Sequence, residues 1–165
     1  MKILLIGCGK MGGAMLSQWV NHGGKFVDEA VTRGCDLDFQ GRAQASMGIA
    51  LGDLDGSGSE ELVVAHLDGE YHAVYRKNSA GYFDDVCRET GIGRETRPFT
   101  GFGICITDFN SDGLNDLLTA NGRVRRPDNH KQAAGFWLPY RQPIQLLLST
   151  SHLDSGHSTK NLADQ

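Results

Sequence analysis

Two loops of this sequence place oxygen-bearing side chains at the same internal spacing, 55 residues apart along the chain. Positions 1, 3, 5 and 9 of each loop carry Asp, Asn, Ser or Glu, and position 6 is glycine. Calcium binds about six to eight oxygens from carboxylates, amides and backbone carbonyls, so each loop could wrap one ion. With a backbone carbonyl from position 7, the candidate metal ligands are Asp53, Asp55, Ser57, Ser59 and Glu61 in the first loop and Asp108, Asn110, Asp112, Leu114 and Asp116 in the second.

The two loops differ from an EF-hand and from each other. An EF-hand requires a bidentate Glu at position 12 and flanking helices, whereas position 12 is Val64 or Thr119 and the flanks are strand-like. The second loop has a carboxylate, Asp112, where the first has the neutral Ser57, so we predict that the first site is the weaker. The alternative for either loop is a hairpin turn that favours Asp and Gly without any metal.

Composition limits the function classes. Glycine is abundant, 22 of 165 residues, which favours many turns between short strands. A net charge of −4 argues against a nucleic-acid partner. The basic residues Arg123, Arg125 and Arg126 are better explained by a solvated loop than by an anion-binding patch.

Neither a disulfide scaffold nor a membrane span is indicated. The four cysteines show no CxxC pair and no regular framework. No stretch reaches the roughly 18 apolar residues of a transmembrane helix. The apolar run Ile3–Ile6 is shorter than the roughly 7–15 residues of a signal peptide, so we expect no export signal in this chain.

Short apolar runs between turns organise most of the chain. The turns, at 53–60, 67–70 and 77–81, are rich in Asp, Gly, Asn and Ser. The predicted strands are Met47–Leu51, Leu62–His66, His72–Arg76, Tyr82–Val86, Phe102–Thr107, Leu117–Ala120 and Ile144–Leu148. The polar residues 149–165 show no period and are predicted to form a disordered tail.

A repeat extends beyond the acidic loops. Identical residues recur at Gly48/Gly103, Ile49/Ile104, Asp53/Asp108, Gly58/Gly113, Leu62/Leu117 and Ala65/Ala120. A second signature, Phe-x-Asp closing at a glycine, starts at Phe26 and again at Phe83. Each unit of about 55 residues has room for four short strands, which is the content of a propeller blade.

Residues 25–148 resemble the VCBS/FG-GAP repeat proteins, specifically the ASPIC/UnbV-type group related to cartilage acidic protein. The matching stretches are Ser46–Asp55, Tyr75–Asn78, Tyr82–Val86, Phe99–Gly103, Thr119–Arg123 and Tyr140–Leu146. The resemblance implies a calcium-stabilised β-propeller that serves adhesion or binding to protein or glycan, without catalysis. It also implies an extracellular or periplasmic location, which conflicts with the missing export signal, so the compartment is left open.

The chain departs from that family in its number of blades. It holds about two, whereas propellers have about four to eight. Two blades cannot close a ring, so the open strand edges require further blades or self-association to cover them. We therefore expect a fragment, a fused reading frame or a piece that needs a partner.

Residues 1–24 read as a strand, a glycine turn and a helix, in a Rossmann-like βα segment. Residues 1–20 resemble the start of pyrroline-5-carboxylate reductase, in which such a turn holds the pyrophosphate of NADPH. The cofactor-binding residues that the resemblance implies are Gly7, Gly9, Met11 and Gly12. The remainder of a dinucleotide site is missing, so an NAD(P)-dependent oxidoreductase fragment is the alternative function.

Three other groups carry weaker signals. His66 and His72 flank the turn at 68–70 and are predicted to be two half-exposed strand residues rather than a metal pair. A catalytic triad has no scaffold in the tail, where the relevant residues are Asp154, Ser155 and His157. An aromatic ligand platform is less expected than packing of a blade face for Phe136, Trp137 and Tyr140.

The sequence therefore predicts a mainly β chain in three parts: residues 1–24, the β-repeat 25–148 and the tail 149–165. The predicted function is a non-catalytic, calcium-binding β-repeat segment. Calcium is the expected cofactor, and NADP enters only under the alternative.

Overall fold

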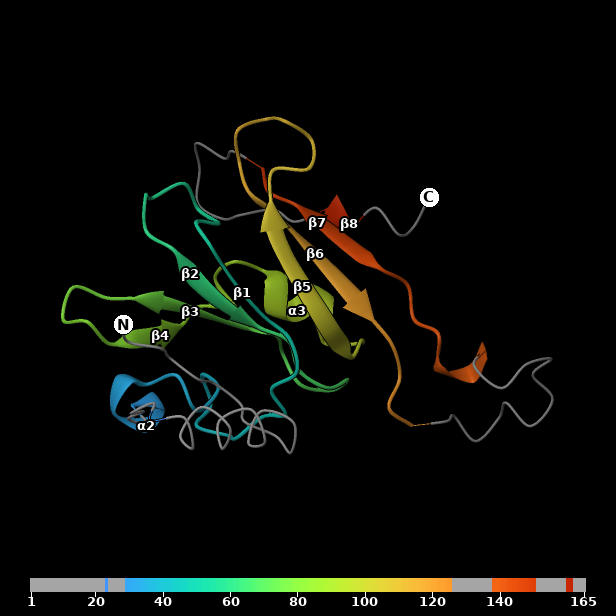
Figure 1. Ribbon diagram of the computed structural model, residues 1–165, viewed down its shortest axis with the longest axis horizontal. Helices are drawn as coiled ribbons and strands as arrows, with labels where there is room; N and C mark the ends of the chain where they lie inside the picture. The colour runs from blue at the N-terminus through green and yellow to red at the C-terminus, as the bar shows by residue number, and fades with distance from the viewer. Residues whose placement is uncertain (1–22, 24–28, 126–137, 151–159, 162–165) are drawn as a thin grey trace.

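The computed structural model describes residues 23, 29–125, 138–150 and 160–161 of the chain. Two four-stranded antiparallel sheets form most of this part, and the helices are short (Figure 1). The prediction of a mainly β chain is confirmed at this level. The expected βα segment lies outside the described residues, apart from Gly23.

The first sheet, sheet A, is a meander of four consecutive strands. They are β1 (Ile49–Gly52), β2 (Glu61–Val64), β3 (Ala73–Lys77) and β4 (Phe83–Asp85). Each lies within two or three residues of its predicted bounds, because Asp, Gly and Asn in the connections end the strands. The first acidic loop joins β1 to β2.

The second sheet, sheet B, repeats this order. Its strands are β5 (Gly101–Thr107), β6 (Asp116–Asn121), β7 (Gln145–Leu148) and β8 (Lys160–Asn161). The second acidic loop joins β5 to β6, and Figure 1 shows it at the same end of the molecule as the first. Strand β8 pairs with β7 in the segment expected to be a disordered tail, most of which lies outside the described residues.

Three short helical segments complete the described part. They are α2 (Ala30–Arg33), α3 (Ile92–Thr96) and the 3-10 turn η1 (Leu138–Tyr140). None of the three was predicted, and no strand was predicted at these positions either. No helix in the described ranges has the length and apolar character to cross a membrane.

The Phe-x-Asp signature ends in the same turn twice. Gly34 and Gly91, which close the two copies, both have left-handed backbone angles, with φ of 77° and 74°. The preceding turns share two backbone hydrogen bonds, Arg33 N to Glu29 O and Gly34 N to Val31 O in the first and the equivalent pair in the second. The first Phe-x-Asp copy itself lies outside the described residues.

The sheets pack face to face over one hydrophobic core. Side chains of sheet A, including Val63 and Val74, meet side chains of sheet B, including Leu117 and Leu147. Glycines allow β1 to lie close against β5: a Cβ on Gly48 would stand 2.5 Å from the Phe102 carbonyl oxygen. A side chain at this position would therefore force the sheets apart.

Opposite faces of the two sheets meet in this core. In sheet A, Leu62 lies across from Tyr75, and in sheet B the matching pair is Leu117 and Leu147. The sheet B pair faces sheet A, whereas Leu62 and Tyr75 face away from sheet B, against Cys35 near α2. The sheets are therefore stacked head to tail: one face of sheet A packs against the opposite face of sheet B. Each sheet has its other face directed away from the shared core.

The predicted half-exposure of His66 and His72 is wrong. Both are buried, with 2% and 0% of their surface exposed. The backbone N–H of His66 donates to Nδ1 of His72, and the ring of His72 occupies the space beside Gly101, where any Cβ would overlap it. Alternation along a strand predicts exposure only when one face of the sheet is solvated. Here His72 is covered by Thr96 of α3 and Gly101 of β5.

Candidate metal centre

The first acidic loop is closed by hydrogen bonds from its backbone to its own side chains. Asp53 accepts from the N–H groups of Ser57 and Gly58, at 3.0 and 2.8 Å. Asp55 accepts from Ser57 N–H, and the Ser57 hydroxyl accepts from Ser59 N–H. At the base of the loop, Glu61 accepts from Leu54 N–H. The loop thus turns its oxygen-bearing side chains inward.

The second loop has the same five bonds at the equivalent positions. Asp108 accepts from the N–H groups of Asp112 and Gly113, at 3.2 and 2.8 Å. The side chains at positions 3, 5 and 9 accept from the matching backbone donors. These residues are Asn110, Asp112 and Asp116. The predicted correspondence of the two loops is therefore present in their hydrogen bonds.

The backbone follows the same path in both loops. Gly58 and Gly113, at position 6, have φ of 82° and 89°, so glycine permits the sharp turn there. At position 4, Gly56 has φ of 71° and Ser111 has φ of 61°. Ser111 holds a left-handed conformation that non-glycine residues rarely adopt, so both loops make the same turn at position 4.

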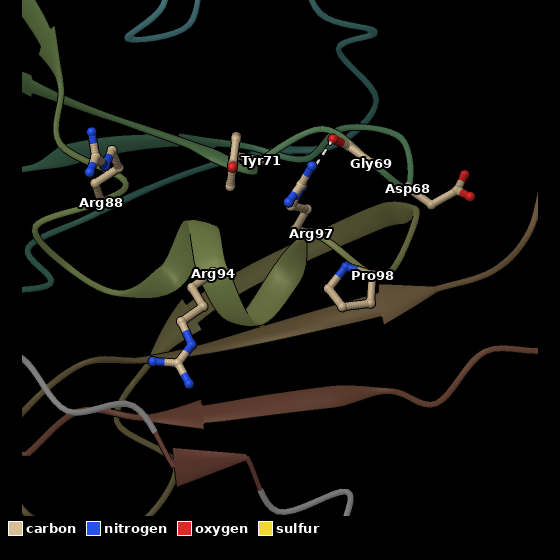
Figure 2. A pocket seen from close by; sticks show the side chains of 7 residues that line it. All are labelled: Asp68, Gly69, Tyr71, Arg88, Arg94, Arg97 and Pro98. Carbon is tan, nitrogen blue, oxygen red and sulfur yellow. Dashed lines mark hydrogen bonds between the residues drawn. The ribbon is translucent and has the colours of Figure 1, made fainter.

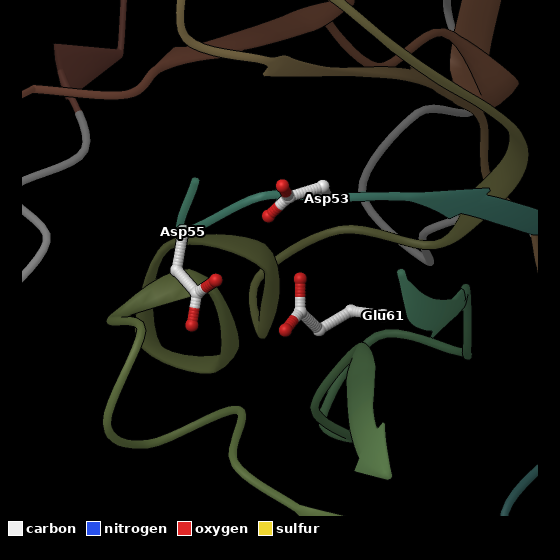
Figure 3. A group of neighbouring side chains, drawn as sticks. All are labelled: Asp53, Asp55 and Glu61. Carbon is white, nitrogen blue, oxygen red and sulfur yellow. The ribbon is translucent and has the colours of Figure 1, made fainter. Parts of the chain in front are cut away.

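Three carboxylates converge in the first loop. Asp53, Asp55 and Glu61 each offer an oxygen, and these atoms lie within 4.8 Å of one another. Figure 3 shows the three groups directed toward a common space. Such proximity suits a divalent cation, although acidic groups also gather without one. The carboxylates of the second loop do not meet the same limit among the described residues.

An arginine from β3 enters the first loop. Arg76 contacts the Asp55 carboxylate at 2.7 Å and the Glu61 carboxylate at 3.0 Å. Glu61 is fully buried, and a buried carboxylate is costly unless a positive charge or hydrogen bonds compensate it. The first loop therefore contains its own cation, a feature that the repeat comparison could not reveal because Arg76 lies outside the loop.

The second loop lacks this arginine. The strand register places Leu148 of β7 where sheet A has Arg76. Asp116, the counterpart of Glu61, is also fully buried, yet its partners are the backbone N–H groups of Phe109 and Ser149, at 2.9 Å each. No salt bridge to Asp116 occurs in the part of the chain that the structure describes. The second loop is thus compensated by backbone hydrogen bonds and, among the described residues, has no cationic side chain.

The pKa values of one carboxyl in each loop are shifted in the direction that favours the ionised form. Burial opposes ionisation of Asp55, but hydrogen bonds from Ser57 and the charge of Arg76 hold its pKa below the ordinary value. Hydrogen bonds from the backbone, led by Gly113, lower the pKa of Asp108 in the second loop. Both carboxyls are therefore ionised at neutral pH, as metal ligands must be.

The two loops are in contact through one hydrogen bond. The side-chain amide of Asn115 donates to the backbone carbonyl of Asp53 at 2.8 Å. The carbonyl of Asn115 in turn accepts from the Ser149 hydroxyl at 2.6 Å. A conformational change in one loop would therefore affect the other loop through the hydrogen bond between Asn115 and Asp53.

Several predicted groups fall outside the described residues. These are the glycine turn with Gly7, Gly9, Met11 and Gly12, the tail residues Asp154, Ser155 and His157, and the aromatic residues Phe136 and Trp137. The described part therefore bears on the two acidic loops and leaves the dinucleotide alternative untested.

The sequence matches no protein-family model, and no curated protein matches it as a relative.

Proposed function

We propose that this chain is a non-catalytic, calcium-binding β-repeat segment of propeller type. In this proposal the two sheets are consecutive blades, and each acidic loop is a cation site between the first two strands of its blade. The ligands are the side chains at positions 1, 3, 5 and 9 and the carbonyls of Ser59 and Leu114. Calcium would be structural, since it would neutralise carboxylates that otherwise repel one another.

One observation carries the proposal: the same loop occurs twice, with a built-in cation in only one copy. Arg76 neutralises the buried Glu61, whereas the equally buried Asp116 has no cationic partner among the described residues. A bound divalent cation would supply the missing charge beside Asp108 and Asp112. We therefore propose that the second loop is the tighter site, in agreement with the expectation from Ser57 and Asp112.

The head-to-tail packing of the sheets supports the blade assignment. Repeated stacking of this kind forms a ring when the rotation closes and an open array when it does not. Two sheets leave unpaired edges and uncovered faces, and β1 exposes Ile49 and Leu51 by 50% and 62%. We infer that further blades or a second copy of the chain cover these surfaces.

The biochemical role in this proposal is the presentation of loops for adhesion to a protein or glycan. Turns at one end of a rigid sheet stack are suited to binding, because the sheets hold the loops in fixed positions. Calcium would fix the two acidic loops further. Location outside the cytoplasm, extracellular or periplasmic, belongs to the same proposal.

Thermal unfolding of the full chain tests the structural role of calcium. A ligand present at about 100 times its dissociation constant stabilises a protein by about 2.7 kcal/mol. For a domain of this size the melting temperature should rise by roughly 5–10 °C in millimolar calcium and return to its starting value after chelation. Magnesium, which prefers smaller and more rigid sites, is the control and should raise it less. Identical melts in calcium and in chelator would count against the proposal.

A further inference from the structure

A basic hollow lies on the side of sheet A that carries α3, between the β2–β3 connection and the helix. It has a volume of about 750 Å³, and its lining residues, labelled in Figure 2, include Arg88, Arg94 and Arg97. This volume falls within the range of small-molecule sites, about 300–1,000 Å³. Such a concentration of arginine is unexpected in a chain whose net charge is −4.

Two of these arginines belong to an ordered stack with aromatic rings. The Arg88 guanidinium lies 5.3 Å from the centre of the Phe39 ring, and the Arg97 guanidinium lies 5.2 Å from that of Tyr71. The rings of Phe39 and Tyr71 are themselves 5.4 Å apart. Cation–π attraction holds each guanidinium over its ring, and the ring leaves the N–H donors available to a ligand.

The stacked guanidiniums have no carboxylate partner in the described part of the chain. Neither Arg88 nor Arg97 forms a salt bridge there. Arg97 Nε donates one hydrogen bond, to the Gly69 carbonyl at 3.4 Å. Asp68 also lines the hollow, but its carboxylate accepts from the Thr100 hydroxyl. Arg94 differs, because Glu95 lies 3.8 Å from it.

From this arrangement we propose that the hollow binds a small molecule carrying two or more oxyanion groups. Guanidinium edges bind carboxylate, sulfate and phosphate oxygens through paired hydrogen bonds. Figure 2 shows Arg88 and Arg97 on opposite sides of Tyr71, so a ligand that engages both needs more than one anionic group. The inference rests on residues apart from the acidic loops and does not depend on calcium binding.

Calorimetric titration of the full chain tests the inference with two probes. Sucrose octasulfate supplies sulfate esters, and trimesate supplies separated carboxylates. The test variant is Arg88→Gln/Arg97→Gln. The matched control, Arg123→Gln/Arg125→Gln, removes the same charge from exposed residues that do not line the hollow.

At least one probe should bind the unchanged chain, and the probe that binds more tightly identifies the oxyanion class. Hydrogen bonds to charged groups contribute about 1.5–3 kcal/mol each, so the test variant should weaken binding more than about tenfold. The control should leave binding within about twofold, and Arg88→Lys/Arg97→Lys, which keeps charge but not the planar fork, should weaken it at least about threefold. Single Arg97→Gln is the fallback if the double variant does not fold. Failure of both probes to bind, equal loss in test and control, or full affinity in the lysine variant would overturn the inference.

Discussion

At the scale of single residues, the difference between the two acidic loops comes down to Arg76. Its guanidinium occupies the first loop between Asp55 and Glu61, and the neighbouring charges raise its pKa although burial acts against them. The equivalent residue of sheet B is apolar. One strand position therefore determines whether a loop contains an arginine; under our proposal, the loop without it takes a cation from solution.

Replacing Arg76 by Leu, the residue at the equivalent position, should convert the first loop to the state of the second. Without calcium the variant should lose stability, because the buried Glu61 would lose its charged partner, at a cost of about 3–5 kcal/mol. Added calcium should raise the free energy of unfolding of the variant by more than it raises that of the unchanged chain. Denaturant unfolding with and without calcium measures both effects; an equal calcium response in the two proteins would contradict this account of Arg76.

The buried histidines predict acid sensitivity. Burial, with a smaller contribution from His66, lowers the pKa of His72 from 6.5 to about 3. Burial also lowers the pKa of His66, against the opposing charges of Glu70 and Asp85. Below pH 6.5 the unfolded chain binds protons that the folded chain excludes, so stability is full above that pH and falls as the pH drops toward 3.

For His72 alone, the loss at about pH 5 should be about 2 kcal/mol. Unfolding free energies at neutral pH and near pH 5 measure it. His72→Gln keeps an acceptor for the His66 N–H. This variant should lose most of the pH-dependent decrease in unfolding free energy that His72 causes, while the decrease caused by carboxylates remains. An identical pH dependence in the variant would show that His72 titrates freely in the folded chain.

At the scale of elements, two glycines at equivalent positions should respond differently to the same substitution. A Cβ on Gly48 would meet the Phe102 backbone at 2.5 Å, whereas on Gly103 its nearest neighbour is the Ala120 side chain at 3.7 Å. Gly48→Ala should therefore destabilise by about 1–3 kcal/mol, since the sheets must separate. Gly103→Ala, the matched control, should be near neutral. Equal effects would mean that β1 and β5 do not approach as closely as the structure shows.

Most strands were predictable because polar turn residues mark their ends. The runs that stop before Asp53, Asp68 and Asn78 gave strand bounds that differ from the observed ones by two residues at most. The helix α3 was missed because five residues are too few for a helical period. His66 and His72 were misplaced because the pattern could not show that Thr96 and Gly101, from later segments, lie against His72 and that His66 lies beside it.

The sequence predicted the parts of the candidate site that lie within one loop. It did not predict the contacts that come from segments distant in the chain. Spacing alone identified the side chains of each loop, and the glycines at position 6 have the left-handed φ that a sharp turn needs. Arg76 lies in β3 and Ser149 directly follows β7, so no motif within the loops could include them. The Arg88–Phe39–Tyr71–Arg97 stack was missed for the same reason, since its members come from separate segments.

At the scale of the whole molecule, the uncovered apolar surfaces predict association. Exposed Ile49 and Leu51 on β1 lie on the face of sheet A that is directed away from sheet B. We expect the chain to form concentration-dependent oligomers in sedimentation velocity. Leu51→Glu should shift it toward the monomer, while Ile144→Glu, an exposed apolar position outside any strand, should not. A monomer at all concentrations would argue that the two sheets need no further cover.

Calcium binding by the two loops is the central claim, and calorimetric titration of the full chain with calcium tests it most directly. Two sites of unequal affinity should appear, with Asp108→Asn removing the tighter and Asp53→Asn the weaker. No heat of binding at millimolar calcium, or titrations unchanged by both substitutions, would contradict the account.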